Sequence, residues 1–428
     1  MSLPDVIEIV PLTALLSAQV TVPGSKSITN RALILAALAN GPVTLRGALW
    51  SEDTQAMFEC LEKLGFEVSA EPDPDEPANR TFKIQGLGGL IPRAGTPEQP
   101  LELFVSNAGT AARFLLAFVC LGKGTYRLSG VPRMHERPQG ALIEALRHLG
   151  YRVDAPNNKL PAVVHGTGPR AAHCEVSISE SSQFASALQL SAPAGGWQVE
   201  IRDFNPDEAP YVTMTLELLK AFPWSGGDFE IEPDASGGSY FVGADYVQRV
   251  KFPQAAGRIV VNHWPTSGWQ IDAEFPKFLP FPTEVSRERD LGDAIMTGIT
   301  LASLHGKPVR FTELGRLRVQ ECERVAALRT ELTKCGAKVE ETGDTLVVQP
   351  SALHGAEIET YNDHRMAMCF ATLGLIVPGL RLKNPACVKK TFPNFFQKLA
   401  APAPHGLGVE IRDARTGRIL GPDDLLAE

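Results

Sequence analysis

The sequence of 428 residues lacks long apolar runs and an excess of positive charge. No apolar stretch reaches the roughly 18 residues of a membrane-spanning helix, so we expect no membrane span. The formal net charge is −8, from 41 basic and 49 acidic residues. This balance argues against a nucleic-acid-binding surface or a basic membrane-binding patch. The first 18 residues lack a basic segment followed by an apolar core, so no signal peptide is expected.

The seven cysteines are scattered and form no C-x-x-C pair. An odd number without close spacing is typical of free thiols in a reducing compartment, rather than of a disulfide framework or a zinc site. None stands beside a partner for nucleophilic catalysis, and Cys120 lies inside an apolar helical pattern. We therefore expect a cytoplasmic protein whose cysteines are not catalytic.

One structural unit repeats along the chain. A short polar turn is followed by a helix, a strand, a second helix and a second strand, and such units open near residues 24, 107, 179, 234, 290 and 361. The helix-to-strand endings at residues 64–68 and 149–153 match in residue type at every position. Units of this size cannot bury their apolar faces alone, so they share cores. The sequence predicts an α/β protein with six repeated αβαβ-type units, divided between two large domains or several smaller ones.

The first unit opens at residues 22–31, between a strand-like run and a helix-like run. Gly24 permits a tight turn, and Ser25 or Ser27 can cap the helix that follows. Lys26 and Arg31 then lie near the positive end of this helix, which favours an anion site. The spacing is not that of a P-loop, and an ordinary capped helix is the alternative.

Basic residues recur beside the turns that open the units. Converging helix N-termini create a positive field without net positive charge, and guanidinium groups bind carboxylates and phosphates in pairs of hydrogen bonds. The pattern predicts a ligand with several negative groups, although any single residue of the set can be an ordinary surface charge. The residues are Lys26, Arg31, Arg113, Arg133, Arg137, Arg324, Arg365 and Lys390.

Carboxylates accompany these cations. Asp293, Glu321 and Asp363 stand in or near the same turns, and His364 follows Asp363. Burial and neighbouring charges tune such groups for proton transfer. On the residues alone, the position of Asp293 favours a helix N-cap, and His364 is equally a candidate core residue that holds its turn.

The set of motifs resembles the family of 5-enolpyruvylshikimate-3-phosphate (EPSP) synthases. Motifs at residues 23–31, 107–113, 132–138, 181–184, 234–241, 361–368 and 390–393 occur in order over nearly the whole chain. The resemblance implies a two-globule inverse α/β barrel with three units in each globule and the active site in the cleft between them. One globule would span residues 25–243, and the other residues 1–24 with 244–428.

The family transfers the enolpyruvyl group of phosphoenolpyruvate to the 5-hydroxyl of shikimate 3-phosphate, through a tetrahedral ketal, and releases phosphate. The resemblance therefore implies a shikimate-pathway transferase of aromatic amino acid and chorismate biosynthesis, a glyphosate target that acts as a monomer without metal or cofactor. Two alternatives stay open. One is an enolpyruvyl transferase with another phosphorylated or nucleotide acceptor, and the other is a non-catalytic binding module of the same fold.

The resemblance also assigns roles to individual residues. Asp293 would be the base for the acceptor hydroxyl, with Glu321 and Lys26 moving protons at the methylene carbon. The residues that would bind shikimate 3-phosphate are Lys26, Ser27, Arg31, Ser181, Ser182, Gln183, Asp293, Arg316 and Gln320. Those that would bind phosphoenolpyruvate are Lys26, Asn107, Gly109, Arg133, Gln183, Arg324, Arg365 and Lys390.

The chain departs from the family pattern mainly on the acceptor side. Glu208 stands where the family usually has a phosphate-binding serine, and a carboxylate there repels a phosphate unless it turns away. Arg316 replaces an asparagine and Gln320 replaces a lysine. Arg316 could supply the charge that Gln320 lacks, or pair with Glu208. Phe114 replaces a common proline, which bears on how glyphosate fits around Gly109.

Overall fold

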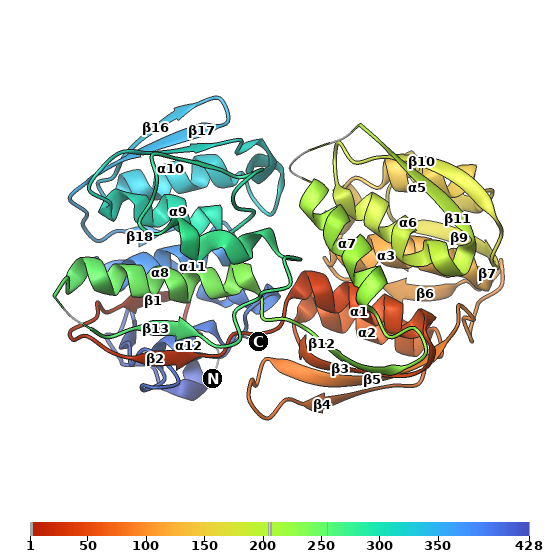
Figure 1. Ribbon diagram of the computed structural model, residues 1–428, viewed down its shortest axis with the longest axis horizontal. Helices are drawn as coiled ribbons and strands as arrows, with labels where there is room; N and C mark the ends of the chain where they lie inside the picture. The colour runs from red at the N-terminus through yellow and green to blue at the C-terminus, as the bar shows by residue number, and fades with distance from the viewer. Residues whose placement is uncertain (1–2, 204, 206–207, 255, 428) are drawn as a thin grey trace. The chain divides into compact units, whose positions relative to one another are not determined.

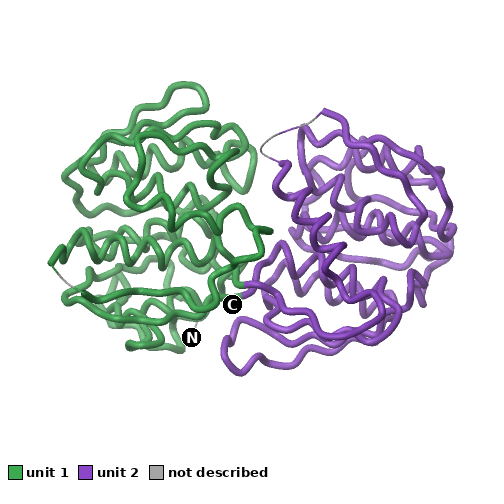
Figure 2. The backbone as a smooth tube through the Cα atoms, in the orientation of Figure 1, with its two compact units in different colours: residues 1–23, 233–428 green, residues 24–232 purple. Residues whose placement is uncertain are grey.

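The computed structural model describes residues 3–203, 205, 208–254 and 256–427, and it divides into two compact units (Figure 1, Figure 2). Unit 1 consists of Met1–Pro23 and Pro233–Glu428, and unit 2 of Gly24–Glu232. The chain therefore leaves unit 1 directly before the opening turn of the first repeat. The expected boundary at residues 243/244 falls inside helix α8 (Ala235–Lys251), whereas unit 1 resumes just before that helix.

Unit 2 is built from three repeats. Its strands are β3 (Asn40–Leu49), β4 (Val68–Pro72), β5 (Asn79–Leu87), β6 (Leu101–Phe104), β7 (Lys123–Ser129), β8 (Arg152–Asp154), β9 (Ala162–Thr167), β10 (Ala172–Ser177), β11 (Trp197–Arg202) and β12 (Gly227–Glu230). Its α-helices are α1 (Lys26–Leu38), α2 (Glu52–Lys63), α3 (Gly109–Phe118), α4 (Pro132–Glu136), α5 (Gly140–His148), α6 (Ser182–Gly195) and α7 (Ala209–Ala221).

Unit 1 holds the other three repeats. Its strands are β1 (Val6–Ile9), β2 (Ala18–Val20), β13 (Ile259–Val261), β14 (Glu284–Ser286), β15 (Val309–Thr312), β16 (Lys338–Thr342), β17 (Thr345–Gln349), β18 (Glu357–Ile358), β19 (Leu380–Lys383) and β20 (Ile411–Asp413). Its α-helices are α8, α9 (Ile295–Leu301), α10 (Arg324–Lys334), α11 (His364–Gly374) and α12 (Phe395–Ala400).

Four sheets share one topology. Their strand orders are β12-β3-β5-β4, β6-β7-β9-β8, β14-β15-β17-β16 and β18-β19-β1-β20. In each, the first pair of strands is parallel and the next two pairs are antiparallel. The remaining sheets, β10-β11 and β13-β2, consist of the parallel pair alone. The predicted six repeats are confirmed, and the antiparallel closing strands are an addition that the sequence pattern did not include.

Each unit has buried helices in its interior, with the sheets around them (Figure 1). In unit 2 these are α1, α3 and α6, which contact one another, and all ten residues of α3 are buried. In unit 1 they are α8, α9 and α11, also in mutual contact, and every residue of α9 is buried. A helix that is apolar on all sides must be surrounded by other elements. This arrangement is the inverse α/β fold that the resemblance implies.

The helix expected after the opening turn is α1, which begins at Lys26, so Ser25 occupies its N-cap position. Gly24 lies so close to β3 that a Cβ there would be 1.9 Å from the carbonyl oxygen of Gly47. The Ser25 side chain makes no cap hydrogen bond with the described residues. Helix α10 begins at Arg324, after a 3₁₀ turn at Gly315–Val319.

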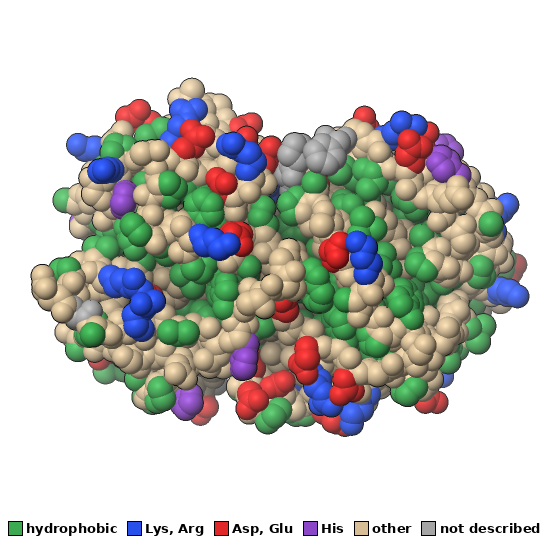
Figure 3. Space-filling model, viewed as in Figure 1, with side chains coloured by type: hydrophobic (Ala, Val, Ile, Leu, Met, Phe, Trp, Pro, Cys, Tyr) green, Lys and Arg blue, Asp and Glu red, His purple; other side chains and the backbone are tan. Residues whose placement is uncertain are grey.

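Within the described ranges, no helix is both long enough and apolar enough to cross a membrane. On the face shown in Figure 3, the Lys and Arg side chains of the described residues stand among Asp and Glu side chains and form no broad basic patch. An anionic ligand would therefore bind at a local cluster of basic residues and not at a broad basic surface.

Candidate active site

Asp293 is the centre of a charged cluster in unit 1. It lies two residues before α9, whose N-cap is Ala294, so the N-cap alternative for Asp293 is wrong; its side chain is 12% exposed. Its Oδ2 lies 3.1 Å from Nε of Arg365 and 3.7 Å from Nη1 of Arg324, and its Oδ1 lies 3.3 Å from Nη2 of Arg287. Burial alone would raise the pKa of Asp293, but Arg365, Arg324 and Arg287 outweigh it and hold that pKa below its usual range. The free protein thus carries a firmly ionised carboxylate.

Arg324 connects Asp293 to the rest of the cluster. Its side chain is 1% exposed, at the first residue of α10. It donates to Oδ2 of Asp363 at 2.7 Å and to Oε2 of Glu321 at 2.8 Å, and it also donates to Oε1 of Gln320. Burial opposes the charge of Arg324, yet these carboxylates raise its pKa above its usual range. Arg324 is therefore a permanent cation inside a set of acceptors.

Glu321 lies between two cations. Its Oε1 is 2.9 Å from Nζ of Lys390, and its Oε2 accepts from Arg324. Lys390 ends a 3₁₀ turn at Pro385–Lys390, and its side chain is 17% exposed. Glu321 and Lys390 come from segments 69 residues apart. Unit 1 therefore brings together Asp293, Glu321, Arg324, Arg365 and Lys390, as the resemblance implies, and these five predicted residues form one network.

The turn before α11 is fixed by Asp363. Asp363 is buried, and its Oδ1 accepts from the backbone N–H of Arg365 at 2.9 Å, so it caps the helix. Tyr361 and Asn362 have φ of 54° and 52°, a left-handed conformation that the turn requires. His364 is buried, with Nδ1 3.6 Å from Asp363. Burial and these contacts favour the core alternative for His364.

Two further charged residues of this cluster were not predicted. Arg287 is 2% exposed and follows β14. Asp272 is buried, and its Oδ1 accepts from the backbone N–H of Ala294 at 2.9 Å, beside Asp293. Burial, and next the charge of Asp293, raise the pKa of Asp272. Arg287 could have been predicted from its position near the opening of the fifth repeat, because the other predicted cations also lie near the openings of repeats.

Lys26 forms the corresponding pair in unit 2. It is the first residue of α1, and its Nζ donates to Oδ2 of Asp53 at 3.0 Å. The Lys26 side chain is 21% exposed and that of Asp53 is 6% exposed. Asp53, in the first turn of α2, was not predicted. In the free protein, Lys26 is therefore paired with a carboxylate, just as Glu321 and Asp293 are paired with cations.

Arg31 is buried in the interior of unit 2, and burial lowers its pKa to about 10. Four of its five N–H groups donate to oxygens of the protein: Oγ1 of Thr215 (2.7 Å), O of Ser27 (2.9 Å), Oγ of Ser186 (3.1 Å) and O of Tyr211 (3.3 Å). Its guanidinium also lies over the ring of Phe114, 5.3 Å from the centroid. Arg31 thus connects α1, α6 and α7, and its expected contact with the acceptor stays a prediction.

The N-terminus of α6 carries the predicted acceptor residues Ser181, Ser182 and Gln183. The Ser181 hydroxyl caps the helix by accepting from the N–H of Gln183 at 3.3 Å. The N–H of Ser182 donates to Oε2 of Glu208 at 2.5 Å, and Glu208 is 3% exposed. Oε1 of Gln183 accepts from Arg113 at 2.6 Å. The carboxylate that replaces the family's serine is therefore turned toward this helix end.

Another group in unit 2 surrounds the start of α3. Arg137 donates to the carbonyl oxygen of Asn107 at 3.1 Å, and a Cβ at Gly109 would lie 2.6 Å from its guanidinium. A side chain at this position would therefore require the Arg137 guanidinium to move. Arg133, on α4, is 63% exposed and pairs with Glu136. Arg316 and Gln320 belong to unit 1, where Arg316 is half-buried and Nε2 of Gln320 lies 3.3 Å from Oδ1 of Asp293.

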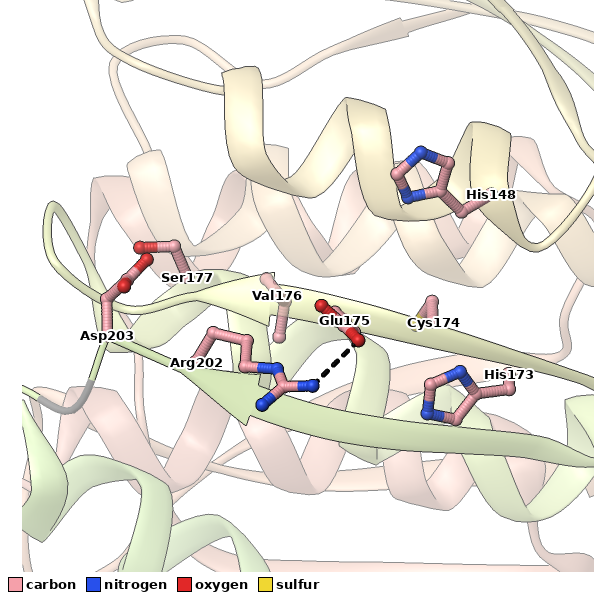
Figure 4. A pocket seen from close by; sticks show the side chains of 8 residues that line it. All are labelled: His148, His173, Cys174, Glu175, Val176, Ser177, Arg202 and Asp203. Atoms are coloured by element: carbon pink, nitrogen blue, oxygen red, sulfur yellow. Dashed lines mark hydrogen bonds and ion pairs between the residues drawn. The ribbon is translucent and has the colours of Figure 1, made fainter.

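A separate groove of about 510 Å³ lies over strands β10 and β11 and the end of α5 (Figure 4). Inside it, Nη2 of Arg202 lies 2.8 Å from Oε1 of Glu175. His148 and His173 also line the groove (Figure 4). None of the predicted site residues lines it. The groove is therefore distinct from the clusters described above.

The chain is similar to known proteins over most of its length. The chain matches the family model of EPSP synthase (3-phosphoshikimate 1-carboxyvinyltransferase) over residues 12–275 and 282–399. It is 35% identical to the 3-phosphoshikimate 1-carboxyvinyltransferase of Trichormus variabilis, over 92% of this chain and 98% of the relative. It is 38% identical to that of Opitutus terrae, over 94% of this chain and 98% of the relative.

Solved structures share the fold. An EPSP synthase from Acinetobacter baumannii superimposes with a TM-score of 0.70 at 20% identity, covering 95% of this chain and all of the other. The enolpyruvyl transferase NikO from Streptomyces tendae gives a TM-score of 0.61 at 16% identity, covering 96% and 99% of the two chains. With the family model matched over most of the chain, and relatives above 30% identity along nearly their whole length, the chain belongs to the EPSP synthase (3-phosphoshikimate 1-carboxyvinyltransferase) family.

Proposed function

We propose that this protein transfers the enolpyruvyl group of phosphoenolpyruvate to the 5-hydroxyl of shikimate 3-phosphate and releases phosphate. The observation that carries the proposal is the network of Asp293, Glu321, Arg324, Arg365 and Lys390 in unit 1. It combines carboxylates for proton transfer with cations for a phosphorylated carboxylic acid. Family membership over most of the chain supports the same reaction.

The first half of the reaction is an addition. The 5-hydroxyl oxygen attacks C2 of phosphoenolpyruvate, its proton passes to Asp293, and C3 receives a proton, which gives a tetrahedral ketal phosphate. In the second half, C3 loses a proton and the C2–O bond to phosphate breaks, which restores the double bond. We assign the proton movements at C3 to Glu321 and Lys26, each of which is paired with an opposite charge within its own unit.

Substrate binding would also activate Asp293. In the free protein, Arg365, Arg324 and Arg287 lower the pKa of Asp293, which makes it a poor base. Phosphoenolpyruvate carries a carboxylate and a phosphate, and both compete with Asp293 for Arg324 and Arg365. As these cations turn to the substrate, the carboxylate becomes more basic, so base strength appears only when the substrate is bound.

The residues of unit 2 complete the proposal. We assign the binding of shikimate 3-phosphate to Ser181, Ser182 and Gln183. The binding of phosphoenolpyruvate is assigned to Asn107, Gly109 and Arg133. Since most N–H groups of Arg31 bind protein oxygens, we assign it mainly the positioning of α1 against α6 and α7. Ser27 supplies one of those oxygens. We further propose a cytoplasmic monomer, and no step requires a metal or a cofactor.

A different acceptor is the second candidate function. Glu208, Arg316 and Gln320 all differ from the family pattern, and all three belong to the predicted acceptor side. The phosphoenolpyruvate-side residues Gly109, Arg133, Arg324, Arg365 and Lys390 keep the pattern. The departures therefore favour, as the alternative, an enolpyruvyl transferase with another phosphorylated or nucleotide acceptor.

The test is phosphate release from phosphoenolpyruvate with shikimate 3-phosphate, and separately with UDP-N-acetylglucosamine. We expect release with the first acceptor only, and its loss in the variant Asp293→Asn. The matched control is Asp344→Asn, an exposed carboxylate of the same unit, which should keep wild-type turnover. Release with neither acceptor from folded protein would overturn the proposal, and retained binding of phosphoenolpyruvate would then favour the non-catalytic module.

A further inference from the structure

We propose that Glu208 is a specificity-determining residue, whose carboxylate occupies the anion position at the N-terminus of α6 and competes there with the acceptor's phosphate. The inference rests on the proposed function, in which Ser181, Ser182 and Gln183 receive shikimate 3-phosphate. It gives Glu208 a defined action: the chain carries its own anion at the place where an anionic ligand is to bind.

The position of the carboxylate is the first support. Oε2 of Glu208 accepts from the N–H of Ser182 at 2.5 Å, and Glu208 is 3% exposed. A charge-assisted hydrogen bond of this length is strong, and helix α6 continues for 14 residues behind it. The carboxylate thus takes a backbone donor at the positive end of a long helix, which is the kind of group that a phosphate oxygen would use.

The surroundings hold the carboxylate in this place. Glu208 directly precedes α7, and its backbone N–H donates to the carbonyl oxygen of Asn205 at 3.1 Å. The Asn205 side chain in turn donates to the carbonyl oxygen of Ser179 at 3.1 Å, two residues before the α6 cap. These two hydrogen bonds connect Glu208, at the start of α7, to Ser179, before α6. They hold Glu208 opposite Ser182.

A consequence for binding follows from charge. A phosphate and a carboxylate cannot share one N–H donor, and two anions a few ångströms apart repel each other strongly in a buried site. An acceptor phosphate must therefore displace Glu208, which weakens acceptor binding. The same competition weakens the binding of free inorganic phosphate, which is a product of the proposed reaction. Glu208 would make the site selective for ligands whose remaining contacts offset that displacement.

The experiment compares wild type with Glu208→Ser and Glu208→Gln. The glutamine variant keeps an oxygen for the Ser182 N–H and removes only the charge, so it remains informative if the serine variant folds poorly. We expect KM for shikimate 3-phosphate to fall at least tenfold in both variants, with KM for phosphoenolpyruvate within about twofold of wild type. Inhibition by inorganic phosphate, competitive with shikimate 3-phosphate, should strengthen. Glu217→Gln, an exposed carboxylate on α7, is the matched control and should change neither constant.

An unchanged or raised KM for shikimate 3-phosphate in the glutamine variant would overturn the inference, because Glu208 would then be only a helix cap. Failure of the proposed function looks different: wild type would release no phosphate with shikimate 3-phosphate. In that case inorganic phosphate serves as the probe in thermal unfolding. Greater stabilisation of Glu208→Gln than of wild type by phosphate supports the anion competition, and equal stabilisation overturns it.

Discussion

Arg324 donates two hydrogen bonds to Asp363, from Nε to Oδ2 at 2.7 Å and from Nη2 to Oδ1 at 3.2 Å, and both side chains are buried. Asp363 also accepts from the N–H of Arg365. One carboxylate therefore fixes both arginines, one at the start of α10 and the other at the start of α11. The pair connects two repeats at the point where both arginines reach Asp293.

The variant Asp363→Asn should destabilise unit 1. Removing one charge of a buried ion pair leaves the other uncompensated and typically costs about 3–5 kcal/mol. Urea denaturation should show a lower midpoint for the variant, and KM for phosphoenolpyruvate should rise because Arg324 and Arg365 lose their common support. The control is Asp228→Asn, whose carboxylate pairs with Arg46 on the surface and should leave the midpoint unchanged. Equal midpoints for both variants would contradict the role of Asp363.

The sequence was sufficient for the repeat pattern and for much of the network in unit 1. Asp293, Arg324 and Arg365 could be predicted because each stands at or near a polar turn before a helix, and such turns are visible as local patterns. Asp53 and Asp272 could not, because their roles come from packing between distant segments: Asp53 lies 27 residues from Lys26. The closing strands were missed for a similar reason, since β1 and β20 join the sheet of the sixth repeat from opposite ends of the chain.

Acid should reduce the stabilising role of Asp293. Arg365, Arg324 and Arg287 hold its pKa below the value of about 3.9 for an unfolded chain, so its contribution is complete above that pH. The contribution disappears as the pH falls further and the folded protein begins to bind the proton. The difference in Tm between wild type and Asp293→Asn should therefore be largest above about pH 4 and shrink below it. A difference that grows on acidification would contradict this assignment.

The pH dependence of turnover should distinguish the pKa of Asp293 in the free enzyme from its pKa in the substrate complex. kcat/KM for phosphoenolpyruvate reports groups before that substrate binds, and kcat reports the complete complex. If the substrate draws Arg324 and Arg365 away from Asp293, the acidic limb of kcat lies at higher pH than the acidic limb of kcat/KM. Steady-state rates between about pH 4 and 8 should therefore show an acidic limb in kcat, whereas the limb that Asp293 gives to kcat/KM lies below this range. A kcat without an acidic limb in this range would show that Asp293 keeps its cations during turnover.

Lys26→Met should abolish turnover in a protein that still folds, with a lower Tm because the buried carboxylate of Asp53 loses its cation. Methionine has a similar length and can pack along the start of α1, but it carries no charge for phosphoenolpyruvate and no proton for C3. We expect kcat to fall by about a thousandfold, the scale of a lost acid/base group, with a circular dichroism spectrum like that of wild type. Lys63→Met, at the exposed end of α2, should keep full activity. A Lys26→Met variant with more than about a tenth of wild-type kcat would exclude Lys26 from the chemistry.

Arg133→Ala should weaken the binding of phosphoenolpyruvate far more than the binding of the acceptor. Arg133 is 63% exposed and pairs with Glu136 on the same short helix, so its loss should hardly affect stability. A hydrogen bond to a charged group contributes about 1.5–3 kcal/mol, which predicts a rise of about 10- to 100-fold in KM for phosphoenolpyruvate.

The matched control for Arg133→Ala is Arg127→Ala, an exposed arginine of the same unit that pairs with Glu102 on β6. It should leave both Michaelis constants at their wild-type values. Glu136→Ala adds a second comparison: because it frees Arg133 from its present partner, KM for phosphoenolpyruvate should stay constant or fall. If Arg133→Ala raised both Michaelis constants equally, Arg133 would act on the site as a whole, and its assignment to phosphoenolpyruvate would be wrong.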